Sequence, residues 1–217
     1  CTAGTIADEV ERGMYNAGYS YVMPNWKVSW EKSLPKIAKA LGNSSIDSDV
    51  DVAVEYRLKH SLERLDFLIY GLDRNNHKNM VIVELKQWSS ISTRYVNNTN
   101  KVYVPEVRVT RRHPMRQLNL YEDNLKNHHS GINNARENGH DIQIGKIVYL
   151  HNFVNKEILY TGAYDRWKEM RHLIYGSGED EKNRLIHMLE QCFINSVEEN
   201  LLSILEDYEA IMGDEGL

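Results

Sequence analysis

The sequence has little cysteine, few prolines and no long apolar run, and each shortage excludes a class of protein. Its cysteines, Cys1 and Cys192, cannot supply the four thiolates of a closed zinc or iron–sulfur site. The four prolines build no proline-rich linker, and no apolar run approaches the roughly 20 residues that a membrane span requires. The first residues lack a signal-peptide pattern, so we expect a soluble, cytoplasmic protein with no membrane partner. Because the chain begins at Cys1 rather than Met, we expect an upstream segment to have been removed or omitted.

The chain does have enough length and apolar content for an independent core. With 217 residues, 41% of them hydrophobic and 26% charged, its composition is that of a typical globular protein. A folded chain of this mass exposes roughly 10,000 Å² of the roughly 37,000 Å² of its unfolded form, so folding needs neither metal nor disulfides. We expect one large domain, or one domain with a helical extension.

Charge is distributed unevenly along the chain, whose 26 basic and 31 acidic residues give a net charge of −5. Residues 179–217 hold 11 acidic and 2 basic residues, which leaves 24 basic and 20 acidic residues, or +4, in the body. The body contains a cluster of arginines, namely Arg108, Arg111, Arg112 and Arg116. Such a patch can bind phosphates, because salt screens like charges beyond about 8 Å. From charge alone, the alternative is a solvated face that aids solubility.

The spacing of apolar residues predicts both helices and strands. The predicted helices span residues 6–15, 25–42 with a kink or restart at Pro35, 114–129, and 182–212 as one helix or a pair. The predicted strands span residues 52–58, 64–72, 80–88 and 143–153, and residues 101–112 are expected to extend the sheet as a basic strand or loop. This order predicts an α/β (α+β) fold, with a mixed central β-sheet flanked by helices.

Two of the predicted strands carry the residues most suited to chemistry. Glu84 and Lys86 stand two apart in one strand and therefore project from the same face. A polar loop joins this strand to the preceding one, and a turn near Asn75-Asn76 would set Asp66 opposite Leu85 or Lys86, within cross-strand reach of both Glu84 and Lys86. We therefore expect two carboxylates and an ammonium to converge at one end of an otherwise apolar hairpin.

Two carboxylates with a backbone carbonyl between them form a hard oxygen site that suits Mg²⁺ or Mn²⁺. Such an ion lowers the pKa of a bound water and neutralises charge that builds on phosphorus. A nearby lysine can stabilise that charge as a compact cation. The alternative interpretation is a solvated salt-bridge cluster at a strand end, worth about 0–1 kcal/mol.

A second motif lies on the predicted helix 114–129, where Gln117 and Tyr121 stand four apart and share one face. With the preceding hairpin, this Q-x-x-x-Y pattern resembles the RecB-like branch of the PD-(D/E)XK nuclease superfamily. The strings R-L-D-F-L-I-Y-G, V-I-V-E-L-K-Q-W, R-H-P-M-R-Q-L-N-L-Y and Y-L-H-N-F are similar to the nuclease-like N-terminal domain of Schlafen-like AAA helicase proteins. The resemblance covers residues 26–153.

The resemblance implies a restriction-endonuclease-like core and a role for each matching position. Asp66 and Glu84 would be metal ligands together with the backbone carbonyl of Leu85, and Lys86 would be the catalytic lysine. Gln117 would order the metal site, and Tyr121 would contact the substrate strand. Some relatives carry a further acid on the first core helix, for which Glu31 is the candidate; an exposed helix charge explains Glu31 equally well, and Glu55 is a weaker candidate. Beside this motif, the arginine cluster is interpreted as a nucleic-acid-binding surface.

The resemblance thus implies a nuclease that depends on Mg²⁺ or Mn²⁺ and hydrolyses phosphodiester bonds, with DNA favoured over RNA as its nucleic-acid partner. By analogy with these relatives, we expect a role in genome maintenance or defence against foreign DNA. The alternative is a non-catalytic nucleic-acid-binding or scaffolding module with a nuclease-like fold.

The chain also departs from these relatives. It contains no G-x-x-x-x-G-K-[ST] motif, so the ATPase half of the helicase relatives is absent, and a separate ATPase or helicase is a candidate partner. The expected domains are a nuclease-like domain over residues 1–178 and an acidic helical extension over residues 179–217. We favour packing on the domain, or assembly into a homodimer, as the role of the extension; autoinhibition of the basic groove is the alternative.

The histidines fit no tight zinc pattern, because the adjacent His128 and His129 would point about 100° apart on a helix. His113 precedes the predicted helix 114–129 and could contact a phosphate or simply hold the loop. A structural role is favoured for His151, at the end of a predicted strand, over a place at the edge of the active site.

Overall fold

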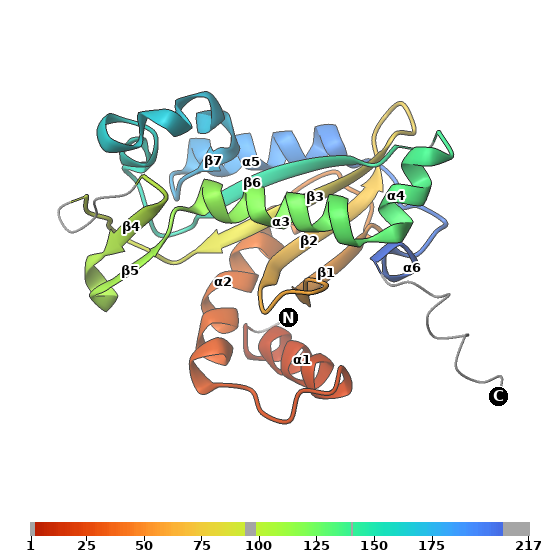
Figure 1. Ribbon diagram of the computed structural model, residues 1–217, viewed down its shortest axis with the longest axis horizontal. Coiled ribbons are helices and arrows are strands. Elements are labelled where there is room, and N and C mark those ends of the chain that lie inside the picture. Colours follow the sequence, from red (N-terminus) through yellow and green to blue (C-terminus); the bar gives the residue numbers. More distant parts are fainter. Residues whose placement is uncertain (1–2, 94–98, 140, 206–217) are drawn as a thin grey trace. The chain divides into compact units, whose positions relative to one another are not determined.

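The structure is a computed structural model that describes residues 3–93, 99–139 and 141–205 (Figure 1). The chain forms two compact units, each assembled from separate stretches of sequence. Unit 1 combines Cys1–Ser45, Leu85–His113 and Val148–His187. Unit 2 combines Ile46–Glu84, Pro114–Ile147 and Met188–Leu217. None of the helices in the described ranges has the length and apolarity to cross a lipid bilayer.

Five strands form a mixed sheet in the order β1-β2-β3-β6-β7. They are β1 (Asp51–Arg57), β2 (Arg64–Leu72), β3 (Lys78–Lys86), β6 (Gln143–Leu150) and β7 (Ile174–Tyr175). β2 pairs with β1 and with β3 in antiparallel fashion, whereas β6 and β7 are parallel. With the helices, this confirms the predicted α/β (α+β) class. The predicted division of the chain at residue 178 stays a prediction.

The β2–β3 hairpin forms the centre of unit 2 and matches its predicted position. Its residues are buried along almost the whole length of both strands, as expected where a sheet is covered on both faces. β3 ends at Lys86, two residues earlier than predicted. There the Lys86 carbonyl accepts a hydrogen bond from the His151 backbone N–H at 3.2 Å, just beyond the end of β6. β6 ends at Leu150 rather than at residue 153.

Helix α3 (Pro114–His128) runs along the sheet in Figure 1 and confirms the predicted helix 114–129. A further helix, α4 (Ser130–Glu137), was not predicted; it packs on α6 (Leu201–Leu205). Gly131 makes this packing possible, because a Cβ atom at that position would lie 2.4 Å from the Ile204 carbonyl oxygen. Buried His129 joins the same contact through its Nδ1 atom, 2.8 Å from the Leu205 carbonyl oxygen.

Within the described residues, the predicted segment 182–212 forms a pair of helices rather than one long helix. Helix α5 (Glu179–Cys192) ends well before residue 212, and residues 193–200 are not helical before α6 begins. The chain leaves the helix because the Ile194 backbone N–H donates to the Leu72 carbonyl at 2.7 Å, at the end of β2. The remainder of the predicted helix, residues 206–212, lies outside the described residues.

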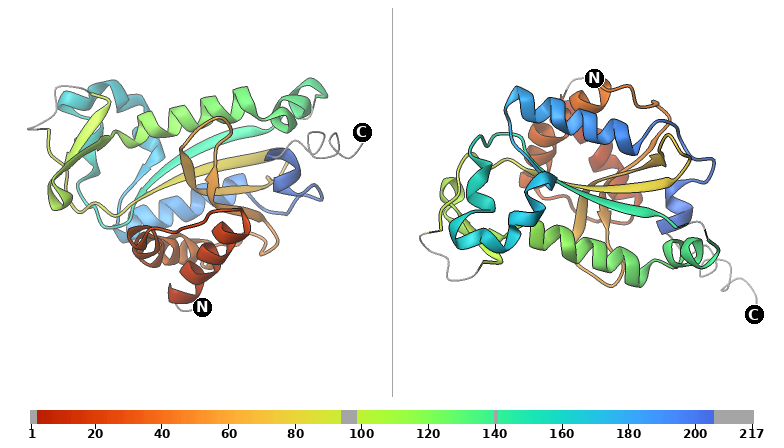
Figure 2. Two further views of the ribbon diagram at one scale, coloured as in Figure 1. Left: turned by 60° about the horizontal axis from the view of Figure 1, so that its bottom comes forward. Right: turned by 90° about the horizontal axis from the view of Figure 1, so that it is seen from above.

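In unit 1, α1 (Ala3–Asn16) and α2 (Pro24–Gly42) lie side by side (Figure 2). The Lys27 ammonium joins them through ion pairs of 2.6 Å to Asp8 and to Glu11. α2 continues as one helix through Pro35, and it ends where predicted, with the Asn43 N–H bonded to the Lys39 carbonyl.

The prediction that the basic segment 101–112 extends the central sheet is wrong. Instead β4 (Lys101–Val104) and β5 (Val109–Arg112) form a separate two-stranded sheet, joined by the 3-10 turn η1 (Pro105–Val107). Arg108 follows η1 in the left-handed conformation, at φ 52°, which reverses the chain. The segment η3 (Gly162–Leu173) consists of two 3-10 helices that meet at a kink at Tyr164, whose hydroxyl donates to the Lys101 carbonyl of this hairpin at 2.8 Å.

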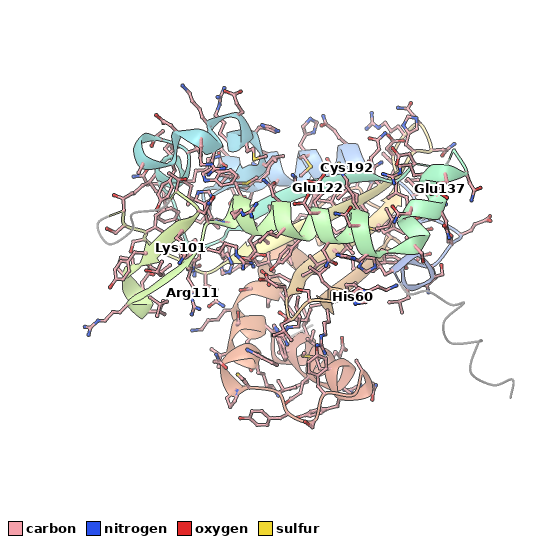
Figure 3. The ribbon with its side chains drawn as sticks, viewed as in Figure 1. His60, Lys101, Arg111, Glu122, Glu137 and Cys192 are labelled. Atoms are coloured by element: carbon pink, nitrogen blue, oxygen red, sulfur yellow. The ribbon has the colours of Figure 1, made fainter. Side chains whose placement is uncertain are left out.

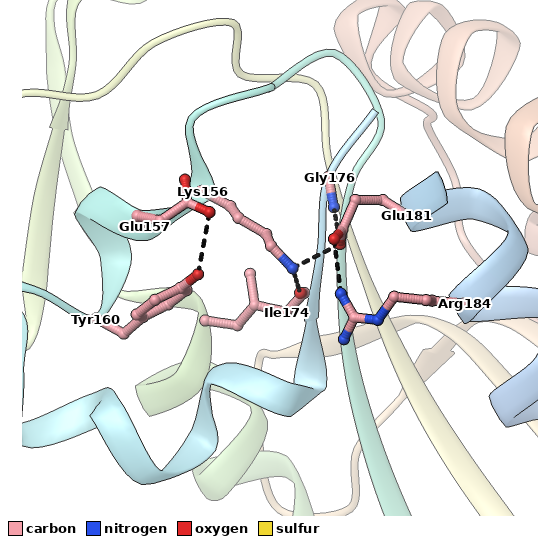
Figure 4. Close-up of polar contacts among 7 residues, drawn as sticks. All are labelled: Lys156, Glu157, Tyr160, Ile174, Gly176, Glu181 and Arg184. Atoms are coloured by element: carbon pink, nitrogen blue, oxygen red, sulfur yellow. Dashed lines mark hydrogen bonds and ion pairs between the residues drawn. The ribbon is translucent and has the colours of Figure 1, made fainter. Parts of the chain in front are cut away.

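A buried lysine joins three further elements of unit 1 (Figure 4). Lys156, in the short 3-10 helix η2 (Lys156–Leu159), donates to the Ile174 carbonyl of β7 at 2.8 Å and to the Glu181 carboxylate of α5 at 2.5 Å. Glu181 also accepts bonds from the Gly176 N–H and from Arg184. The lysine charge is therefore balanced inside the unit, as burial requires.

Candidate active site

Asp66 and Glu84 occupy matching positions on neighbouring strands of unit 2. The β2–β3 ladder pairs Phe67 with Val83, and continuing this register by one residue sets Asp66 opposite Glu84. The predicted partners of Asp66, Leu85 or Lys86, are therefore wrong by one or two residues. Directly opposite residues on antiparallel strands project from the same face, with Cβ atoms about 5 Å apart. The two carboxylates thus share one face of the hairpin.

The register differs from the predicted one because the loop closes more tightly than its polar sequence suggested. The Asp73 side chain accepts hydrogen bonds from the backbone N–H groups of Asn75 and His77, at 2.8 and 2.9 Å. These bonds close a loop in which Leu72 is already paired with Lys78. The Asp73 side chain therefore fixes the turn, and its centre is Asn75 rather than the Asn75-Asn76 pair.

The face of α3 that carries Gln117 and Tyr121 lies next to these two acids. Gln117 donates a short hydrogen bond from Nε2 to the Tyr121 hydroxyl. Burial raises the pKa of Tyr121 above its usual range, and the negative charges of Glu84 and Asp66 raise it further. Tyr121 is only 2% exposed and Glu84 only 1% exposed, so this phenol and this carboxylate interact with little screening by water, whereas Asp66 is half-buried. Tyr121 therefore stays protonated at neutral pH and can donate a hydrogen bond.

Leu85 and Lys86, which end β3, belong to unit 1. Side chains alternate along a strand, so Lys86 projects from the same face of β3 as Glu84. Its ammonium lies 5.1 Å from the centre of the Trp88 ring, and the side chain is half-buried. The face of the Trp88 ring attracts this ammonium electrostatically.

The two further acids considered above differ in their surroundings. Glu31 lies half-buried on α2, and its role as a ligand stays a prediction. Glu55 lies on β1 at the level of Asp66, between the pairs Val54–Phe67 and Tyr56–Leu65. It adopts a left-handed backbone conformation, at φ 54°, and its carboxylate forms a 3.0 Å ion pair with Arg64. Glu55 is therefore committed to a structural pair.

The donor set can be compared with the needs of a divalent ion. Within the described ranges, no group of three or more His, Cys, Asp or Glu side chains is arranged to hold a metal. Asp66 and Glu84 would supply two carboxylates, and the other ligands would be a backbone carbonyl, water and substrate oxygens. This all-oxygen set fits Mg²⁺ and Mn²⁺, which keep several waters and bind proteins through one or two carboxylates.

The predicted nucleic-acid-binding arginines are split between the units. Arg116 lies half-buried on α3 of unit 2, whereas Arg108, Arg111 and Arg112 belong to the β4–β5 hairpin of unit 1. Figure 3 labels Arg111 and Lys101 on this hairpin. Lys101 pairs directly with Arg112, and Arg111 is exposed beside them. Sequence reasoning missed Lys101, because only the cross-strand pairing reveals its neighbour.

A pair of like charges directly opposite on a hairpin costs stability. Lys101 and Arg112 are such a pair.

Both histidines with two open interpretations are structural. His113 is fully buried, stacks on Trp167 with ring centres 5.0 Å apart, and lies 2.9 Å from the Leu159 carbonyl oxygen through Nε2. Burial lowers the pKa of His113 to about 4. His151 is 6% exposed, and its Nε2 atom lies 3.0 Å from the Ser33 hydroxyl. Both imidazoles are thus engaged in contacts within unit 1.

Comparisons with protein-family models, with curated proteins and with solved structures found no match.

Proposed function

We propose that the protein is a nuclease that depends on Mg²⁺ or Mn²⁺ and hydrolyses phosphodiester bonds, with DNA as the favoured substrate. The observation that carries this proposal is the placing of Asp66 opposite Glu84, on one face of the hairpin, beside a protonated Tyr121. The resemblance to the RecB-like PD-(D/E)XK nucleases predicts the same residues from the sequence. The alternative interpretation expected a solvated salt-bridge cluster, whereas Glu84 is only 1% exposed.

Each residue has a chemical task in this proposal. Asp66 and Glu84 provide the negatively charged oxygens that would hold the ion. The ion, when bound, would lower the pKa of a water and offset charge on the phosphate. Hydrolysis forms a bond from the water oxygen to phosphorus, breaks the bond to one sugar oxygen, and returns a proton to that oxygen.

The remaining residues of the motif would act on the substrate. The Lys86 ammonium would stabilise the extra negative charge that the phosphate carries in the transition state. Tyr121 would donate its hydroxyl proton in a hydrogen bond to a phosphate oxygen, and Gln117 would fix the direction of that hydroxyl. The hairpin residues Lys101 and Arg112 would bind the backbone of the strand without reading its sequence.

The test is a cleavage assay with Mg²⁺ or Mn²⁺ on linear, circular and single-stranded DNA and on RNA. We expect the parent protein to cut at least one DNA form, and Asp66→Ala and Lys86→Ala to be slower by a factor of about 100 or more. Asp123→Ala, which removes an exposed carboxylate from α3, is the matched control and should cut at the parent rate. A Lys86→Ala protein as fast as the parent would defeat the proposal. Nucleic-acid binding without cleavage would favour the non-catalytic module instead.

A further inference from the structure

Four hydrogen-bond donors in unit 1 converge on one carboxylate oxygen of Glu106. The backbone N–H groups of Ser89 and Ser90 lie 2.8 and 2.6 Å from its Oε1 atom. The Ser90 hydroxyl lies 3.3 Å from the same oxygen, and the Ser89 hydroxyl makes a short bond to it. Partial desolvation raises the pKa of Glu106, but the bonds from Ser89 and Ser90 outweigh it and hold the pKa below its usual value. The donors thus favour a full negative charge at this point.

The donors are held in position by the structure around them. The segment that contains them follows β3, and the backbones of Ser92 and Tyr103 pair with each other at 2.9 and 3.2 Å, so that the segment lies along β4. Ile91, between the serines and this pair, is buried. A site with fixed N–H and O–H groups needs little reorganisation to accept another anion.

The contact is also accessible and lies in positive surroundings. Glu106 and Ser89 are exposed and Ser90 is half-buried, so an incoming anion can reach the donors. Glu106 belongs to η1, the turn between the two basic strands, and exposed Arg108 follows it in that turn. The donors themselves come three and four residues after Lys86. An oxygen of a phosphodiester has the same hydrogen-bonding demands as the carboxylate oxygen that the donors now hold.

We propose that Ser89 and Ser90 form a binding site for a phosphate of the nucleic-acid strand, and that Glu106 occupies this site in the free protein. The strand phosphate replaces the Glu106 carboxylate on the same donors, and the turn that carries Glu106 swings away. No covalent bond changes in this exchange. The proposal rests on the proposed function for the identity of the ligand, but its test does not depend on cleavage.

The experiment measures binding of a fluorescein-labelled single-stranded oligodeoxynucleotide by anisotropy, in EDTA and at one fixed salt concentration. When an internal group occupies a site, the apparent affinity of a competing ligand is the intrinsic affinity multiplied by the fraction of time for which the site is open. For a site that is open about a tenth of the time, Glu106→Ala should bind the oligonucleotide about tenfold more tightly than the parent. Ser89→Ala in the Glu106→Ala background should reverse most of that gain.

The matched control is Glu169→Ala, which removes another exposed carboxylate of unit 1 and should change binding by less than about twofold. Equal gains in Glu106→Ala and Glu169→Ala would overturn the proposal, because net charge alone would then explain the effect. Glu106→Gln, which keeps an acceptor oxygen, should show an intermediate gain. Loss of folding in both Glu106 variants would also overturn it, because the contact would then be structural. If Glu106→Ala binds the oligonucleotide more tightly but the protein never cleaves nucleic acid, the proposed nuclease function is wrong and the proposed phosphate site is supported.

Discussion

Acid should destabilise the protein through His113. This imidazole is fully buried against Trp167, and its Nε2 atom must carry a proton because the Leu159 carbonyl can only accept a hydrogen bond. Protonation of the ring would place a positive charge at a position from which water is excluded. The nearby charge of Arg166 disfavours the imidazolium further.

The size of the effect follows from the two pKa values of His113. Its pKa is about 4 in the folded protein, against the ordinary value of 6.5 in the unfolded chain. Between these pH values the unfolded chain binds more protons, so stability is complete above pH 6.5 and falls as the pH is lowered toward 4. The loss amounts to about 2 kcal/mol at pH 5 and about 3 kcal/mol at pH 4.

Urea unfolding at pH 7 and pH 5 measures this loss. His113→Phe retains a ring to stack on Trp167 but cannot titrate, so its free energy of unfolding should fall by about 2 kcal/mol less than that of the parent between these two pH values. Burial also lowers the pKa of His151. Its contribution is the same in both proteins and cancels when their changes in the free energy of unfolding are subtracted. His60→Gln, at an exposed position, should behave as the parent. Equal pH dependence in His113→Phe and the parent would refute the reasoning. A nuclear magnetic resonance titration that placed the His113 midpoint near 6.5 would do the same.

One further substitution in each unit tests its packing, Gly131→Ala in unit 2 and Glu181→Gln in unit 1. Gly131→Ala should lower the free energy of unfolding by about 2 kcal/mol or more, because its Cβ atom would lie within 2.4 Å of the Ile204 backbone; an unchanged urea midpoint would contradict this close approach. Glu181→Gln should cost about 3 kcal/mol, because it leaves the buried Lys156 ammonium without its carboxylate, whereas Glu179→Gln on the exposed first turn of the same helix should cost less than about 1 kcal/mol. Similar thermal midpoints for the two glutamate variants would argue against a buried ion pair.

The sequence predicted the central hairpin and α3 well because both carry strong local signals. The apolar residues of β2 and β3 form continuous runs, and Pro114 stands at the first position of α3. The β4–β5 hairpin lacked such a signal. Its reversal depends on a left-handed Arg108, a conformation that glycine or asparagine usually adopts.

Tertiary contacts explain the other elements that were missed. η3 is anchored by the Trp167 side chain, which donates to the Thr99 carbonyl at 2.9 Å. α4 is separated from α3 by buried His129, which contacts α6. Contacts between residues far apart in the sequence leave no periodic pattern, so helix spacing alone could not reveal these boundaries.

The sequence suggested which residues form the candidate site, but it did not predict the register between their strands. A slip of one residue moves every side chain of a strand to the other face, and a partnership of Asp66 with Leu85 would have separated the two acids. The observed register depends on the Asp73 side chain, which closes the loop. The hydrogen bonds from Ser89 and Ser90 to Glu106 join residues that are 17 and 16 positions apart in the sequence, so no short motif could reveal them.

Binding of Mn²⁺, followed by electron paramagnetic resonance, tests the central claim most directly. In the proposed function, Asp66 and Glu84 together supply the carboxylates for a divalent ion. The parent and Asp123→Asn should bind Mn²⁺ with the same affinity, and Asp66→Asn should bind it at least about tenfold more weakly. An Mn²⁺ affinity that Asp66→Asn leaves unchanged would contradict the account.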